Sequence, residues 1–230
     1  MLIFSYFLVR DKSRETVGIQ IDLKNSLLNM GDIMDAVVDV TNMVLETERL
    51  ILRAYRPTDL DDFYEYASEK EVGEMAGWKA HKSIEESKEI LNLFLEEKKT
   101  LAIVYKENNK VIGSIGLEPL RVDLIGNEYE NLKGREIGYA LSKDYWGKKI
   151  MPEAVKRVID YLFREMGYDF LSVCHFKTNL RSQRVIEKCG FKLIKEENLD
   201  TAIMKNIPGK VYILMNSEKN GSNIYVEKCV

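Results

Sequence analysis

The chain has 230 residues and a formal net charge of −3, from 34 basic and 37 acidic side chains. This near balance argues against a nucleic-acid platform, which normally carries a basic surplus, so we expect no nucleic-acid partner. The length suffices for one sizeable core and at most two small domains. Cys174, Cys189 and Cys229 form no CxxC pair, and the chain has only two histidines, so we expect no metal site.

The apolar start of the chain does not have the features of a targeting segment. The first nine residues, MLIFSYFLV, lack a basic flank and a small-residue cleavage site, and they are too short to span a bilayer. An odd number of scattered cysteines is typical of a reducing compartment. We therefore expect a cytoplasmic protein that has no membrane segment.

The pattern of the sequence divides the chain into three parts. Residues 1–42 alternate apolar segments with a polar run and allow a hairpin followed by a helix near Leu27 to Val40, but they indicate no function. The regular pattern begins after them. We predict an N-terminal extension of unknown role at 1–42, a main domain at 43–217, and a loose C-terminal tail at 218–230.

In the main domain, strand and helix periods follow one another in an order typical of a mixed α/β domain around one sheet. Strands are predicted, in chain order, at 49–55, 101–105, 111–117, 135–142, 170–176, 191–197 and 210–216. Helices are predicted at 57–67, after the capping box of Ser83 and Glu86, over about fifteen residues before Gly167, and at 179–190.

The stretch YWGKKIMPEAV, from Tyr145 to Val155, places glycine and two lysines just before a predicted helix. The N–H groups from Gly147 to Met151 could converge on a phosphate there, and Lys148 and Lys149 add positive charge. Pro152 fits the first turn, where its missing N–H costs nothing. The alternative is a plain surface turn. A Walker loop and a dinucleotide fingerprint are both excluded, because the required glycine spacing is missing.

Two linked motifs carry a family resemblance: REIGYALSKDYWGKKIMPEAVKRVIDYLF and, after it, NLRSQRVIEKCGFKLIKE. They resemble the GNAT superfamily of acetyl-CoA-dependent N-acetyltransferases, and in particular its ribosomal-protein (Rim-type) branch, over about Val44 to Ser217. The resemblance implies a central, mostly antiparallel sheet of about six to seven strands with a parallel split pair, flanked by about four helices. It also implies acetyl-CoA as co-substrate.

The resemblance assigns the cofactor to two segments. The loop of Trp146, Gly147, Lys148, Lys149, Ile150 and Met151 would hold the diphosphate through main-chain amides, although Trp146, Lys149 and Met151 depart from the superfamily pattern of R/Q-x-x-G-x-G/A. The strand end of Ala140, Leu141 and Ser142 would carry the pantetheine arm, and the Leu141 N–H would meet the thioester oxygen. Asn179 and Ser182 complete the cofactor-binding set.

The resemblance also suggests catalytic residues. Glu136 lies where relatives carry a general base, and the alternative is a strand glutamate that pairs with Arg135 or Lys133. Many relatives protonate the leaving thiolate with a tyrosine, but Ile186 occupies that position here. Ser182 and Asn179 are then the polar candidates, with helix capping as the alternative role. Cys189, on the apolar helix face, is predicted to be buried and inert.

The expected partner is an amine acceptor, and the chain itself is expected to be a monomer or a homodimer. The branch resemblance suggests a protein N-terminal amine, while a polyamine or an aminoglycoside stays open. Other hypotheses are a CoA-binding sensor without turnover and a phosphate-binding domain for another nucleotide. His175, and the wall of Glu74, Trp78 and His81, are candidate contacts of the acceptor.

Overall fold

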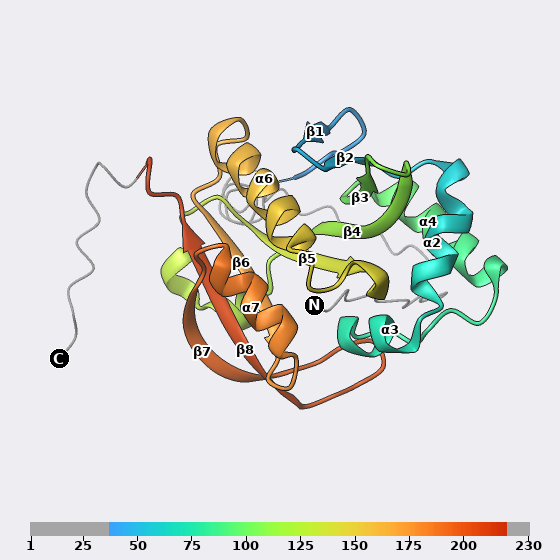
Figure 1. Ribbon diagram of the computed structural model, residues 1–230. Helices are drawn as coiled ribbons and strands as arrows, with labels where there is room; N and C mark the ends of the chain where they lie inside the picture. The colour runs from blue at the N-terminus through green and yellow to red at the C-terminus, as the bar shows by residue number, and fades with distance from the viewer. Residues whose placement is uncertain (1–36, 220–230) are drawn as a thin grey trace, which may run out of the picture.

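In the computed structural model, which describes residues 37–219, eight strands form one sheet in the order β1-β2-β3-β4-β5-β6-β8-β7 (Figure 1). The strands are β1 (Val44–Glu46), β2 (Leu50–Ala54), β3 (Thr100–Tyr105), β4 (Lys110–Glu118), β5 (Gly134–Leu141), β6 (Phe170–Phe176), β7 (Lys192–Leu199) and β8 (Ile207–Met215). The helices are α2 (Leu60–Ala67), α3 (Lys70–Ala76), α4 (Ile84–Glu97), α5 (Val122–Ile125), α6 (Ile150–Arg164) and α7 (Leu180–Lys188).

This architecture confirms a mixed α/β fold with a mostly antiparallel sheet and one parallel pair. The sheet has eight strands because the three residues of β1 pair with β2, and a strand that short shows no period in the sequence. The helices α3 and α5 were also missed, because they are too short to show a helical period in the sequence. The expected hairpin, most of the helix expected near Leu27 to Val40, and the tail beyond 219 lie outside the described residues. Residues 37–40, the end of that expected helix, are not helical.

The parallel pair of β5 and β6 opens into a split. The two strands pair only from Gly134 to Glu136, opposite Phe170 to Ser172, and the rest of β5 has no strand partner on that side. On its other side β5 pairs with β4 from Glu136 to Leu141, which is the end of the strand. One edge of β5 from residue 137 onward is therefore open to another extended chain.

Helices cover both faces of the sheet. α6 and α7 lie next to each other on the face toward which Tyr139 and Leu141 point (Figure 1). α2, packed against α4, lies on the opposite face. α6 is held by an apolar stripe whose buried members are Ile150, Met151, Ala154, Val155, Val158 and Leu162. In residues 37–219, no helix has the length and apolar character needed to cross a membrane.

Candidate active site

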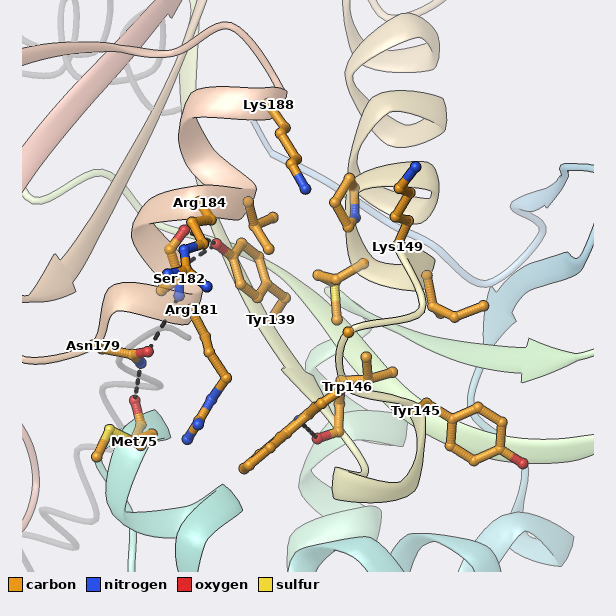
Figure 2. Close-up of a pocket in the computed structure, with 16 residues that line it drawn as sticks. Met75, Tyr139, Tyr145, Trp146, Lys149, Asn179, Arg181, Ser182, Arg184 and Lys188 are labelled. Atoms are coloured by element: carbon orange, nitrogen blue, oxygen red, sulfur yellow. Dashed lines mark hydrogen bonds between the residues drawn. The ribbon is translucent and has the colours of Figure 1, made fainter.

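A cavity of about 260 Å³ lies between the start of α6, the helix α7 and the open end of β5 (Figure 2). Eight of the residues predicted from the sequence line it: Leu141, Trp146, Gly147, Lys149, Ile150, Met151, Asn179 and Ser182. Glu136, Ala140 and Ser142 are not among the lining residues, because the side-chain period of two turns them to the other face of β5.

The turn before α6 lines this cavity and contains unpaired main-chain donors. Gly147 has φ 76° and Lys149 has φ 60°, so the chain makes two left-handed steps before the helix begins at Ile150. In the described part of the chain, the N–H groups of residues 147–151 donate no hydrogen bond, whereas the Trp146 N–H donates to Lys143 O at 3.0 Å. Five consecutive N–H groups without an acceptor at a helix N-terminus form a favourable site for an anion.

Lys148 does not line the cavity, in contrast to Lys149. Its ammonium lies 5.1 Å from the centre of the Tyr145 ring, and its carbonyl oxygen accepts from Arg49 at 3.1 Å. It is therefore not among the residues that line the cavity, although its main-chain N–H belongs to the unpaired set. Of the two lysines predicted beside the phosphate, the structure brings only the Lys149 side chain to the cavity wall.

The ionic side chains of the cavity are all cationic. Lys149, Arg181, Arg184 and Lys188 line it, and no aspartate or glutamate does. Within residues 37–219, Lys149, Arg184 and Lys188 make no ion pair, and Figure 2 shows Lys149 on one wall and the α7 cations on the other. Uncompensated positive charge on both walls suits a polyanionic ligand.

Sequence reasoning missed the three α7 cations. The signal was their spacing of three and four residues, which places Arg181, Arg184 and Lys188 on one face of a helix. Arg181 also fixes the cavity wall, because its guanidinium lies 4.0 Å from the centre of the Trp146 ring. The Trp146 indole N–H in turn donates to Leu141 O at 2.9 Å, which ties the turn to the end of β5.

A buried phenol accompanies the predicted polar residues of α7. The Tyr139 hydroxyl lies 3.0 Å from Ser182 Oγ, and both residues line the cavity. Burial raises the pKa of Tyr139 well above its usual value, so this hydroxyl keeps its proton. Sequence reasoning missed Tyr139 because it looked for a tyrosine at Ile186, which is buried.

Asn179 caps α7 and joins it to α3. Its Oδ1 accepts from the Ser182 N–H at 3.1 Å, and its Nδ2 donates to Met75 O at 3.4 Å. The predicted capping role is therefore present, and a role toward a ligand stays a prediction. The same cap holds Ser182 next to Tyr139.

Removing this cap gives a first prediction. We expect Asn179→Ala to lower the free energy of unfolding by about 1 kcal/mol, because an alanine cannot accept from the first turn of α7. Asn179→Asp keeps that acceptor and loses the donation to Met75 O, so it should lose clearly less. Urea unfolding followed by circular dichroism measures both variants. Equal losses for the two would show that the cap does not stabilise α7.

Glu136 lies beyond the cavity, on the opposite face of β5, and is 4% exposed. Its Oε1 accepts from Arg121 Nη2 at 2.6 Å and its Oε2 from Arg121 Nε at 3.1 Å. The two partners of Glu136 expected from the sequence are wrong. Arg135 donates to Leu117 O instead, and Lys133 donates to Met166 O. The role of Glu136 as base stays a prediction.

Three of the remaining candidates, His175, His81 and Cys189, are buried, whereas Glu74 is exposed and forms an ion pair with Lys70. The His175 ring is fully buried between Phe176 O and the Tyr212 hydroxyl, and burial lowers its pKa to about 4. His81 Nδ1 lies 2.7 Å from Ser87 Oγ, and burial lowers its pKa as well. Burial raises the pKa of the Cys189 thiol to about 12, so it is not a thiolate nucleophile at neutral pH.

The free amides, the cations on two walls of the cavity and the open strand edge together suit an extended, negatively charged cofactor. Residues 49–192 match the family model described as Acetyltransferase (GNAT) domain, and the chain belongs to this family. GNAT acetyltransferases use acetyl-CoA, so the chain is an acetyl-CoA-dependent N-acetyltransferase.

A curated relative and two solved structures are similar to the chain. The chain is 27% identical to the Bacillus subtilis N-acetyltransferase YoaA over 154 residues, which are 65% of this chain and 82% of YoaA. It is similar to a GNAT acetyltransferase structure from Bacillus anthracis, with a TM-score of 0.66, 20% identity, and coverage of 76% of this chain and 99% of that one. RimL, a ribosomal-protein alpha-N acetyltransferase solved with coenzyme A, matches with a TM-score of 0.61 at 15% identity, over 75% of this chain and 98% of RimL.

Proposed function

We propose that the chain moves the acetyl group of acetyl-CoA directly to an amine, while the N–H groups of residues 147–151 hold the diphosphate of the cofactor. The observation that carries this assignment is the run of unpaired donors at the start of α6, facing a cavity whose ionic side chains are all positive. Coenzyme A is a polyanion, so both features favour its binding. Lys149, Arg184 and Lys188 supply the side-chain contacts.

The open edge of β5 orients the rest of the cofactor. From residue 137 onward the main-chain groups on the edge away from β4 face the split. Apart from Leu141 O, which accepts from Trp146, they are free to bond the amides of the pantetheine arm. The thioester then lies in the split, where the Leu141 N–H is the proposed donor to its carbonyl oxygen. The neutral hydroxyls of Tyr139 and Ser182 are placed on the cavity side, where either can donate a hydrogen bond to the leaving thiolate.

A protein N-terminal α-amine is the proposed acceptor. The support is similarity to the ribosomal-protein branch of the family, of which RimL is an example. An α-amine has a pKa of about 7.7–8.0 against about 10.4 for a lysine, so it loses its proton with far less assistance. Polyamines and aminoglycosides form the alternative acceptor class, since the fold alone does not select a substrate.

The experiment that tests this function separates binding from turnover. We expect calorimetry to detect CoA binding, and a thiol assay to detect CoA release from acetyl-CoA when peptides with free N-termini are added. Spermidine and an aminoglycoside form the second arm of the panel. Release with these amines alone would replace the peptide acceptor by a small molecule.

A non-catalytic sensor is the competing function. It is favoured by Lys149 and Met151, which stand where the family usually has small residues in the diphosphate loop. CoA binding with no thiol release on any amine of the panel would favour the sensor. Binding of ATP in competition with CoA would instead favour a general nucleotide site.

A further inference from the structure

Two glutamates lie side by side on the sheet face opposite the cofactor cavity. Glu118 on β4 and Glu136 on β5 are direct partners in the strand register, so their side chains share one face. Glu136 is in turn the register partner of Ser172 on β6, at the last paired position before the split. Both carboxylates are therefore level with the closed end of the split.

The two carboxylates differ in what occupies their oxygens. Both oxygens of Glu136 accept from Arg121, whose other contact is to Cys174 Sγ. Glu118 uses only Oε2, which lies 2.9 Å from Lys99 Nζ. Its Oε1 is buried and has no hydrogen-bond partner in the described part of the chain. A buried acceptor without a partner is unfavourable unless something else donates to it, so this oxygen indicates a missing donor.

The surroundings of Glu118 suit a proton acceptor. Burial raises its pKa above the ordinary value, Lys99 lowers it in part, and the neighbouring Glu97 and Glu136 raise it again. Arg121 faces the pair from the segment after β4. A carboxylate with a raised pKa is a stronger base toward an ammonium than an ordinary surface glutamate. Glu136, in contrast, has both oxygens occupied by Arg121, so it has no free acceptor for an amine.

We propose that Glu118 accepts the proton of the acceptor amine, and that the ion pair of Arg121 and Glu136 positions the amine beside it. This inference rests on the proposed acetyl transfer and replaces Glu136 by Glu118 as the base. One proton passes from the ammonium to Glu118 Oε1, and the free nitrogen pair attacks the thioester carbonyl carbon. The C–N bond forms, the nitrogen loses its second proton, and the C–S bond breaks. That second proton goes to the leaving thiolate, so CoA thiol and an amide are the products, and Glu118 releases its own proton to solvent.

The test is the pH profile of kcat/KM, with acetyl-CoA saturating and the best amine of the peptide and polyamine panel as acceptor. Because Glu118 acts in its ionised form, the wild-type rate should fall as pH falls through its raised pKa. Glu118→Gln should lower kcat/KM by about 100-fold or more and remove this acid limb. Its Kd for CoA, measured by calorimetry, should stay within about twofold, since Glu118 does not line the cofactor cavity.

Three further variants separate catalysis from structure. Lys99→Met removes the partner of Glu118 and leaves the base, so the acid limb should move to higher pH while the rate at high pH is kept. Glu118→Asp keeps a carboxylate at this position, so part of the acid limb that Glu118→Gln removes should be present in this variant. Glu136→Gln should lower the rate and leave the acid limb in place.

The outcomes that overturn the inference are distinct from failure of the proposed function. If Glu118→Gln keeps the acid limb and Glu136→Gln removes it, Glu136 is the base and the inference is wrong. If Lys99→Met loses as much activity as Glu118→Gln, the role of Glu118 is to hold that ion pair. If the wild type acetylates no amine of the panel, the proposed transfer itself fails, before any variant is compared.

Discussion

Reversing two charges on α7, in the double variant Arg184→Glu and Lys188→Glu, should weaken CoA binding by about 100-fold or more. The reason is that both side chains line the cavity and make no ion pair within residues 37–219, so their charge is available to the ligand. A hydrogen bond to a charged group contributes about 1.5–3 kcal/mol, so two lost contacts cost about 3 kcal/mol or more. Calorimetric titration with CoA at a fixed salt concentration measures the loss.

The matched control carries the same change in net charge outside the cavity. Lys195 and Lys205 are surface lysines with acidic neighbours, so Lys195→Glu with Lys205→Glu changes the total charge equally. We expect this control to bind CoA almost as well as the wild type. The dependence of log Kd on salt should also become shallower in the α7 variant only. Equal losses in the two double variants would mean that total charge, and not the α7 face, attracts the cofactor.

The turn before α6 is the part of the candidate site that the sequence predicts best, and the reason is that it is local. A helix start, its proline in the first turn and the free N–H groups before it all depend on residues 145–155. The same holds for the cap of Asn179 on α7. The strands and long helices are also predicted, since each shows its period over its own residues.

The ionic contacts of the site could not be predicted in the same way. Arg121 binds Glu136 from an irregular segment with no period, and the expected partners Arg135 and Lys133 are only close in sequence. The free oxygen of Glu118 depends on the register between β4 and β5, which single-strand patterns do not fix. These contacts depend on the tertiary path of the chain.

The alternation of β5 divides the site into two compartments. Tyr139 and Leu141 face the cofactor cavity, while Glu136 and the carboxylate of Glu118 lie on the other face. The split between β5 and β6 connects the two, because strand pairing ends at Glu136. The cationic cavity and the two ion-paired carboxylates are thereby kept apart by one layer of backbone.

Substituting valine for Gly147 should raise the Kd for CoA by about tenfold to 100-fold. The cause is conformational, since a Cβ at Gly147 would meet no heavy atom within 4 Å. Gly147 has φ 76°, in the left-handed region, where a β-branched residue is a strong outlier. The turn should relax to negative φ and direct the N–H groups of residues 147–149 away from the cavity.

Gly167→Val is the control that isolates this effect from stability. Gly167 also has a positive φ, of 65°, and a Cβ there would make only an ordinary contact, at 3.8 Å from Lys219 Nζ. Both variants should lose about 1–2 kcal/mol of unfolding free energy, the cost of a side chain in the left-handed region. Only Gly147→Val should also lose CoA affinity, because Gly167 lies beyond the far end of α6 and does not line the cavity. Unchanged affinity in Gly147→Val, at a comparable loss of stability, would show that the diphosphate does not rest on these amides.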